Sequence, residues 1–188
     1  AYTFTPLANY AGSIPVATYT ISAGSTTPAL TDTATLTLTM GSNTPPVATD
    51  DIKAVIEDTV ATGNVLTDGT PDSDADSNPL SVTGFSIDTN GDSIAETFTA
   101  GQTATITGVG TLTIDSTGAY TFTPALNYTG AIPVATYAIT DGLGGTDTAT
   151  LTLGPVSPVN DAPTASPASI TPTEDTPISV PLIGSDVD

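Results

Sequence analysis

Apolar and polar residues alternate along several short stretches of this chain. The clearest run extends from Thr33 to Thr39, where Ala34, Leu36 and Leu38 are separated by threonines. The same alternation recurs in four further segments: 103–106, 111–114, 120–122 and 148–153. Because successive side chains of a strand point to opposite faces, this pattern predicts strands with one buried and one solvent-exposed face.

The residues between these runs are typical of turns. Gly occurs 17 times and Pro 16 times, and the commonest residue is Thr, which is β-branched and favours strands. Four dipeptides have the composition of tight turns: Asn90-Gly91, Thr117-Gly118, Asp141-Gly142 and Gly144-Gly145. No segment shows a convincing amphipathic helical pattern. The sequence therefore predicts an all-β protein with many turns.

The chain contains an internal repeat. The segment AYTFTPLANYAGSIPVATYTI at 1–21 returns as AYTFTPALNYTGAIPVATYAI at 119–139, and TDTATLTL at 31–38 returns at 146–153. The triplet Glu-Asp-Thr occurs at 57–59 and at 174–176, and Ser-Asp-x-Asp at 73–76 and 185–188. The spacings indicate a repeat of about 115 residues, which is the size of one domain.

The repeat divides the chain into three parts. Residues 1–42 correspond to the C-terminal part of one repeat, residues 43–157 to a complete repeat, and residues 158–188 to the N-terminal part of the next. Proline-rich segments at 43–47 and 155–163 separate the parts and predict short, stiff linkers. About seven strands in such a repeat fit an immunoglobulin-like or cadherin-like β-sandwich.

Composition excludes several classes of function. The 188 residues include 20 acids, one basic residue (Lys53) and no Cys, His or Trp, which gives a net charge of -19. Neither disulfides nor Cys or His metal sites can form, and no Ser-His or Cys-His nucleophile pair exists. A nucleic-acid surface needs cations that this chain lacks. No apolar run is long enough to cross a bilayer, and no signal peptide is visible.

The acids are gathered at turns and linkers, where several oxygens could converge on one cation. Calcium takes six to eight oxygen ligands and suits such loops. The strongest candidates are Asp72, Asp74 and Asp76, since an Asp-x-Asp pair recurs at Asp186 and Asp188. Other short acidic groups are Asp50-Asp51, Glu57-Asp58, Asn160-Asp161 and Glu174-Asp175. The alternative is that these are solvated acidic loops.

A second kind of candidate loop begins at Asp88. Oxygen-bearing side chains stand at Asp88, Asn90, Asp92 and Glu96, with Gly91 between them. The spacing resembles the first part of an EF-hand-like calcium loop, but no bidentate Glu stands at its twelfth position and no helix flanks it. The alternative is an ordinary Asn-Gly hairpin turn.

These motifs, taken together, resemble the cadherin-like, immunoglobulin-like repeats of giant bacterial adhesins of the RTX and VCBS types. The resemblance is carried by five segments over nearly the whole chain: 118–124, 127–130, 137–142, 160–163 and the Asp72 string. It implies an extracellular protein at the bacterial surface or in the biofilm matrix. It also implies calcium between successive domains.

The resemblance assigns ligands to two junctions. At the second junction, Asn160, Asp161, Asp186 and Asp188 would act with Glu57 and Asp141 of the preceding domain. At the first junction, Asp74 and Asp76 would bind calcium, and Asp50 and Asp51 would substitute for the acids that its linker lacks.

The function expected from this resemblance is structural. The chain would be an extender module of an adhesin or surface fibre, stiffened by calcium, and its partners would be neighbouring repeats or head-to-tail copies, with no nucleic acid and no membrane insertion. One alternative is a segment of a self-assembling filament. Another is a ligand-binding repeat in which Thr35, Thr37 and Thr39 face ice or a polysaccharide. An enzyme is not expected, because no catalytic residues converge.

Overall fold

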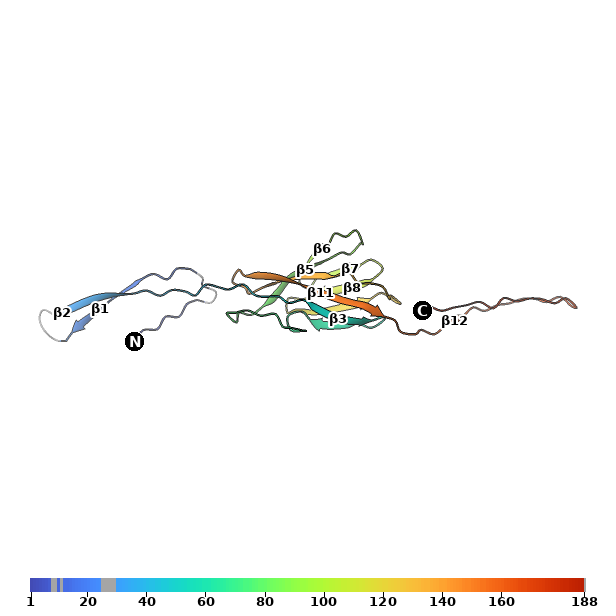
Figure 1. Cartoon of the computed structure of the whole chain (residues 1–188), viewed down its shortest axis with the longest axis horizontal. Helices are drawn as coiled ribbons and strands as arrows, with labels where there is room; N and C mark the ends of the chain where they lie inside the picture. Colours follow the sequence, from blue (N-terminus) through green and yellow to red (C-terminus); the bar gives the residue numbers. More distant parts are fainter. Residues whose placement is uncertain (8–9, 11, 25–29, 188) are drawn as a thin grey trace.

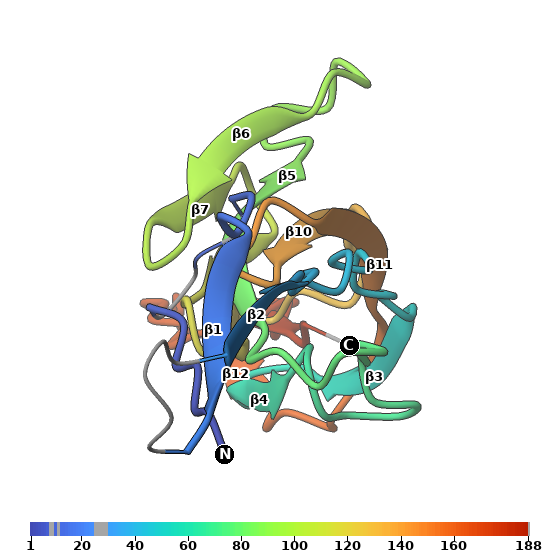
Figure 2. The ribbon, with the colours of Figure 1, turned by 90° about the vertical axis from the view of Figure 1, so that its left-hand side faces the viewer.

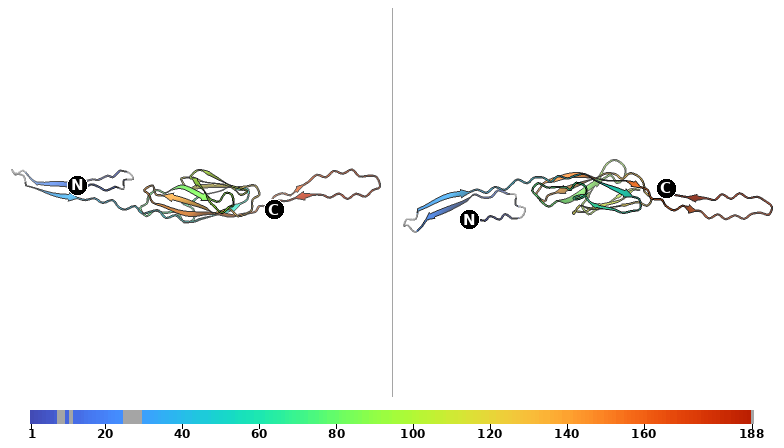
Figure 3. Two further views of the ribbon diagram at one scale, coloured as in Figure 1. Left: turned by 90° about the horizontal axis from the view of Figure 1, so that it is seen from above. Right: turned by 60° about the horizontal axis from the view of Figure 1, so that its bottom comes forward.

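The computed structural model describes residues 1–7, 10, 12–24 and 30–187. Figure 1 shows three parts in line: a hairpin of β1 (Ala17–Ala23) and β2 (Leu30–Leu36), a central β-sandwich, and a long C-terminal loop closed by β12 (Thr164–Ala165) and β13 (Gly184–Ser185). Figure 3 shows residues 158–187 running out from the sandwich and returning as two extended segments. All regular structure in these ranges is β-strand.

The sandwich consists of two sheets. The first has the strand order β3-β11-β10-β5-β6 and the second β4-β9-β8-β7. The bounds of these strands are β3 (Asp51–Ile56), β4 (Ala61–Asn64), β5 (Ser81–Ile87), β6 (Glu96–Thr99), β7 (Thr103–Ile106), β8 (Gly110–Ile114), β9 (Ala119–Pro124), β10 (Ala135–Thr140) and β11 (Thr146–Ser157). The β3–β11 pair is parallel and the others are antiparallel. Figure 2 shows the two sheets end-on behind the β1–β2 hairpin.

The core lies between the two sheets and follows the period-two pattern. In β9, Tyr120 and Phe122 are buried while Thr121 and Thr123 are exposed. Leu112 and Ile114 of β8 and Tyr137 of β10 have no exposed surface. Alternation thus places each apolar side chain inside, where its removal from water stabilises the fold.

The structure confirms the all-β sandwich and the strands expected near 103–106, 111–114, 120–122 and 148–153. The strand expected from Thr33 to Thr39 differs, because β2 ends at Leu36. Its partner β1 begins at Ala17, which pairs with Leu36, so within the described ranges the later residues have no neighbouring strand. In the sandwich the equivalent strand β11 continues to Ser157 because β3 pairs with it.

Among the described residues, no helix is both long and apolar enough to cross a membrane.

Candidate functional site

At the N-terminal end of the sandwich, hydrogen bonds join the incoming linker to two acidic loops. The amide of Asn43 donates to Asp141 Oδ2 at 2.6 Å, and the Thr44 N–H donates to Asp76 Oδ2 at 2.7 Å. The amide of Asn78 in turn donates to Asn43 Oδ1 at 3.0 Å. Oxygens from three separate segments therefore meet where the preceding repeat joins the sandwich.

Asp141 is held rigidly at the end of β10. It is 4% exposed, and its Oδ1 accepts the N–H groups of Leu143 at 2.7 Å and Gly145 at 2.9 Å. The Asn43 amide, with further help from these two backbone donors, lowers the pKa of Asp141 despite the opposing effect of desolvation. A Cβ at Gly145 would collide with Asp141 Oδ2, so the glycine leaves room for this carboxylate. Asp141 is therefore an ionised, fixed oxygen donor.

Asp74 has one satisfied and one unsatisfied oxygen. Its Oδ1 accepts the N–H groups of Asp76 at 2.8 Å and Asn78 at 3.0 Å, which fixes the loop. Its Oδ2 is buried and has no hydrogen-bond partner in the part of the chain that the structure describes. A buried carboxylate oxygen without a donor is costly unless a cation or proton compensates it. The Asp-x-Asp pair thus fits a cation.

Asp72 does not belong to this group, which corrects the expectation of a single site at Asp72, Asp74 and Asp76. Its Oδ1 accepts the Thr49 N–H at 2.7 Å, and both its oxygens lie 3.3–3.4 Å from the Tyr137 hydroxyl. Burial is the main cause that raises the pKa of Asp72. Asp72 therefore bonds to the interior of the sandwich, whereas Asp74 Oδ1 bonds to the backbone of its own loop.

Asp72 is part of an interior cluster with Asp51 and Tyr137. The Tyr137 hydroxyl lies 2.8 Å from Thr49 O, 3.1 Å from Val65 O and 3.3 Å from Asp51 Oδ2. Asp51 is 3% exposed, and its Oδ1 has no hydrogen-bond partner among the described residues. Burial raises the pKa of Asp51 to about 6. The single hydroxyl proton of Tyr137 thus faces several acceptor oxygens, so this cluster has fewer hydrogen-bond donors than acceptors.

Asp50 and Asp51 do not supply the first linker with acids, contrary to the expectation. Asp51 points into the interior cluster, and Asp50 Oδ1 accepts the Thr150 N–H at 2.8 Å, which lowers the pKa of Asp50. The pair stands at the start of β3, beside Leu151 of β11. The linker instead uses Asn43, the repeat partner of Asn160 at a spacing of 117 residues. That correspondence is the sequence signal that points to Asn43.

The four candidates of the Asp88 loop lie together. Asp88 accepts the N–H groups of Asn90, Gly91 and Ser93 at 2.7–3.1 Å, and the Gly91 N–H is the main cause that lowers the pKa of Asp88. The Asn90 amide donates to Asp92 and to Glu96, both at 3.2 Å. The loop thus connects β5 and β6, and its side-chain oxygens accept hydrogen bonds from within the loop.

The C-terminal end of the sandwich contains Glu57. This residue is 2% exposed; its backbone N–H donates to Ser157 O at 3.0 Å, and its Oε1 accepts the Val159 N–H. Glu57 therefore fixes the outgoing linker, where the Asn160 amide donates to the Asp161 carbonyl at 2.8 Å. Asp186 lies near β13, and Asp188 lies outside the described residues.

Glu57 and Asp141 do not serve one junction, contrary to the expectation. Asp141 precedes the start of β11 and Glu57 pairs with its end, so the length of that strand separates them. Parallel pairing of β3 with β11 carries Glu57 to the C-terminal end, whereas the β10–β11 turn holds Asp141 at the N-terminal end.

Within the described ranges, no three acidic side chains are already arranged as a metal site. In a comparison with protein families, residues 43–156 match the model of the bacterial cadherin-like domain. A search of curated proteins finds no match. The matched region contains the sandwich except for Ser157, the last residue of β11, and it includes Asp76, Asp141 and Glu57.

Proposed function

Since the match over 43–156 means that the chain belongs to the bacterial cadherin-like domain family, we propose that it is a structural extender module of an extracellular adhesin or surface fibre, stiffened by calcium at its junctions. Domains of this family are typical of bacterial secreted or surface proteins, and no catalytic family is indicated. The location of this chain would be the cell surface or the biofilm matrix.

One observation carries the proposal: the linker at 43–44 is bonded directly to Asp141 and Asp76, and Asp74 of the same loop as Asp76 has a buried, unsatisfied Oδ2. A cation at these oxygens would cross-link the linker to two loops. The bend between the preceding repeat and the sandwich would then be restricted. Extension of a rod requires this restriction, because flexible joints shorten the mean end-to-end distance.

The chemistry of the donors fits calcium. Asp74, Asp76 and Asp141 offer carboxylate oxygens and Asn43 offers an amide oxygen, all of them hard ligands of the kind that calcium takes. The chain cannot neutralise these acids itself, because Lys53 is its one basic side chain against 20 acids. At the other end, Glu57, Asn160 and Asp161 would make the corresponding contribution to the next junction. The loop of Asp88, Asn90, Asp92 and Glu96 would be a separate site within the domain.

Calcium titration calorimetry with thermal unfolding tests the proposal. The chain should bind calcium, and its unfolding midpoint should rise from EDTA to millimolar calcium, since a ligand specific to the folded state stabilises it by about 2.7 kcal/mol at a hundredfold excess over Kd. Small-angle scattering should show a stiffer particle. The double variant Asp76→Asn with Asp141→Asn should lose the junction site, while Asp32→Asn, an exposed acid of the hairpin, should behave as the parent.

The Asp88 loop is separated by its own variant. Asp88→Asn with Asp92→Asn should remove one binding event and leave the scattering response to calcium intact. If calcium produced neither heat nor a change in the unfolding midpoint of the parent chain, the acids would be solvated loops and the proposal would be wrong. If binding occurred but persisted unchanged in the Asp76, Asp141 variant, the junction assignment would fall.

A further inference from the structure

The Tyr137 hydroxyl group lies among more oxygen atoms than it can bond. Its oxygen is 2.8 Å from Thr49 O and 3.1 Å from Val65 O. It is also 3.3 Å from Asp51 Oδ2 and 3.3–3.4 Å from the two oxygens of Asp72. A phenol donates one proton, so most of these contacts bring acceptor oxygens together with no hydrogen atom between them. Oxygens of several segments thus converge on one point inside the sandwich.

Asp51 is the least compensated member of this cluster. Its side chain is 3% exposed, and its Oδ1 has no hydrogen-bond partner among the described residues. The charges that act on Asp51 are those of Asp72, Asp68 and Asp50, and all three are negative. A buried, ionised oxygen in these surroundings is unfavourable unless a cation or a proton compensates it.

Asp72 adds a second carboxylate that its surroundings compensate only in part. Its Oδ1 accepts the Thr49 N–H at 2.7 Å. Burial is nevertheless the main cause that raises the pKa of Asp72, and the negative charge of Asp147 adds to the effect. Asp51 and Asp72 therefore place two negative charges at one hydroxyl group, and one divalent cation neutralises that amount of charge.

The oxygens of the cluster come from segments that only the folded chain brings together. Asp51 begins β3 and Tyr137 lies in β10, and both strands belong to the first sheet. Val65 directly follows β4 of the second sheet, and Thr49 lies two residues before β3. An ion bound at these oxygens would join the two sheets, and it would bind the folded chain in preference to the unfolded one.

The unpartnered oxygen of Asp51 lies close to the protein surface. A Cβ added at Gly69 would be 3.5 Å from Asp51 Oδ1, and Gly69 itself is exposed. Asp51 Oδ1 is thus next to a residue that contacts solvent, although the Asp51 side chain is buried. This position gives an ion a short path into the cluster.

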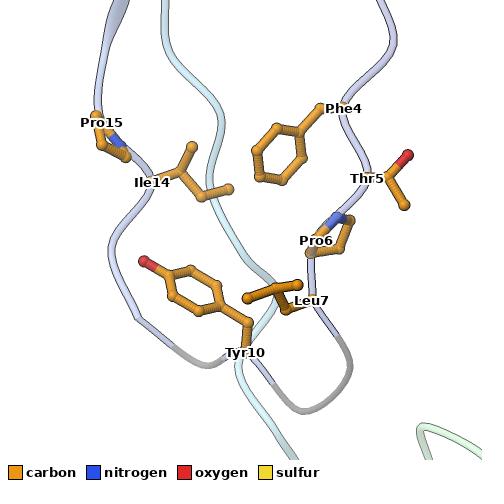
Figure 4. Close-up of a pocket in the computed structure, with 7 residues that line it drawn as sticks. All are labelled: Phe4, Thr5, Pro6, Leu7, Tyr10, Ile14 and Pro15. Atoms are coloured by element: carbon orange, nitrogen blue, oxygen red, sulfur yellow. The ribbon is translucent and has the colours of Figure 1, made fainter.

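The carboxylates distinguish the cluster from the hollow drawn in Figure 4. That hollow has a volume of about 200 Å³, and Figure 4 shows Phe4, Tyr10 and Ile14 pointing into it. Its lining in the described part of the chain is uncharged: Phe4, Thr5, Pro6, Leu7, Tyr10, Ile14 and Pro15. Oxygen ligands for a cation are therefore found at Asp51 and Asp72 and not in the hollow.

We propose that Asp51 and Asp72 bind one calcium ion inside the sandwich, with the carbonyl oxygens of Thr49 and Val65 and with water as further ligands. Two acidic side chains, rather than three, supply the charge of this site. Calcium takes six to eight oxygens and accepts carboxylates, main-chain carbonyls and water in flexible geometry, whereas magnesium requires a strict octahedron. The ion compensates the oxygens that the single Tyr137 proton cannot serve.

The interior site is separate from the proposed junction site. Asp74 and Asp76 are bonded to backbone groups of their own loop and of the linker, and Asp141 is bonded to Asn43. Asp51 and Asp72, by contrast, contact Tyr137 between the sheets. The interior ion therefore stabilises the sandwich itself, whereas the junction ion would restrict the bend at the linker. Either site can exist without the other.

Urea unfolding in EDTA and in millimolar calcium tests the interior site. The measurements use the whole chain with Asp76→Asn and Asp141→Asn, here called the junction-deleted chain, so that the junction does not contribute. At free calcium a hundredfold above Kd, the interior site should raise the ratio of folded to unfolded chain about 100-fold. Adding Asp51→Asn should remove this gain. In EDTA the same variant should be the more stable chain, because the amide removes an uncompensated charge.

A matched control is available at the neighbouring position. Asp50→Asn removes the same charge from an exposed residue whose Oδ1 accepts the Thr150 N–H, so it should gain as much from calcium as the junction-deleted chain does. Titration calorimetry gives an independent count of the ions. Asp51→Asn and Asp72→Asn should each bind one calcium ion fewer than the junction-deleted chain, and Asp50→Asn should bind the same number.

Two results overturn the interior site: a calcium-induced gain in stability that is the same with and without Asp51→Asn, or an unchanged number of bound ions in that variant. Either result would mean that a proton or a buried water compensates Asp51. Failure of the junction assignment has a different signature, because the junction-deleted chain would then bind as many ions as the parent. A parent chain that bound no calcium would overturn both.

Discussion

Replacing Asp51 with Asn should stabilise the sandwich at neutral pH. Asp51 is 3% exposed, its Oδ1 has no hydrogen-bond partner among the described residues, and the charge of Asp72 lies close to it. Burial is the main cause that raises the pKa of Asp51 from 3.8 to about 6; Asp72, Asp68 and Asp50 add to the effect, and the Tyr137 hydroxyl opposes it. Asn keeps the shape and an acceptor oxygen but removes the charge.

The pKa gives the magnitude. A rise of about two units corresponds to about 3 kcal/mol, since each unit is worth about 1.4 kcal/mol. The folded-state pKa lies above the unfolded value, so Asp51 costs nothing below about pH 4 and its cost grows as the pH rises through about 6. Above that pH the ionised Asp51 lowers the free energy of unfolding of the parent by the whole amount, whereas the uncharged amide does not. We therefore expect the free energy of unfolding of Asp51→Asn to exceed that of the parent by about 1–3 kcal/mol at about pH 7.5.

Urea unfolding of the parent and of Asp51→Asn, in EDTA from about pH 4 to about pH 8, measures this difference. The two chains should be similar near pH 4 and diverge as the pH rises. Asp115→Asn is a useful contrast, because the Thr117 hydroxyl is the main cause that lowers the pKa of Asp115, a half-buried residue between β8 and β9. That variant should show no gain at neutral pH. An Asp51→Asn chain that was less stable than the parent at neutral pH would refute the reasoning, and would indicate that a cation compensates the ionised carboxylate.

Three further substitutions test the packing by chemical denaturation. Tyr137→Phe removes the donor shared by several buried acceptors and should cost about 1–3 kcal/mol, with the largest loss where the acids are ionised. Leu112→Ala opens a cavity at a side chain with no exposed surface and should cost about 2–5 kcal/mol; a loss below about 1 kcal/mol would mean that the sheets can close over it. Gly84→Ala places a Cβ 2.5 Å from the Phe98 carbonyl oxygen and should cost about 1–3 kcal/mol by displacing β6, while Gly41→Ala, which meets nothing within 4 Å, should be neutral.

The fold class could be read from the sequence because local patterns determine it. Alternation in segments such as 120–122 identifies the strands and their buried faces without knowledge of their partners. The internal repeat supports the register of β1–β2 as well, because the same residues recur in β10–β11. Strand ends are less predictable: the run from Thr33 stops at Leu36 because a strand needs a neighbour along its edge.

The candidate site was predictable in composition but not in grouping. The sequence identified the acidic loops, since Asp-x-Asp pairs and Asn-Asp linkers are visible as motifs. It could not determine that Asp72 bonds to Thr49 and Tyr137 while Asp74 bonds to its own loop, because the partners of Asp72 are distant along the chain. Nor could it place Asp51, whose burial depends on the contact with Tyr137 of a distant strand.

The sequence by itself therefore determined the strands, the repeat and the chemistry of the loops, because each rests on neighbours along the chain. The tertiary structure decided which acids share an end of the sandwich. Parallel pairing of β3 with β11 carries Glu57 to the outgoing linker, and the hairpin between β10 and β11 returns Asp141 to the incoming one. Such long-range pairings bring together residues about 100 positions apart, and no local pattern contains that information.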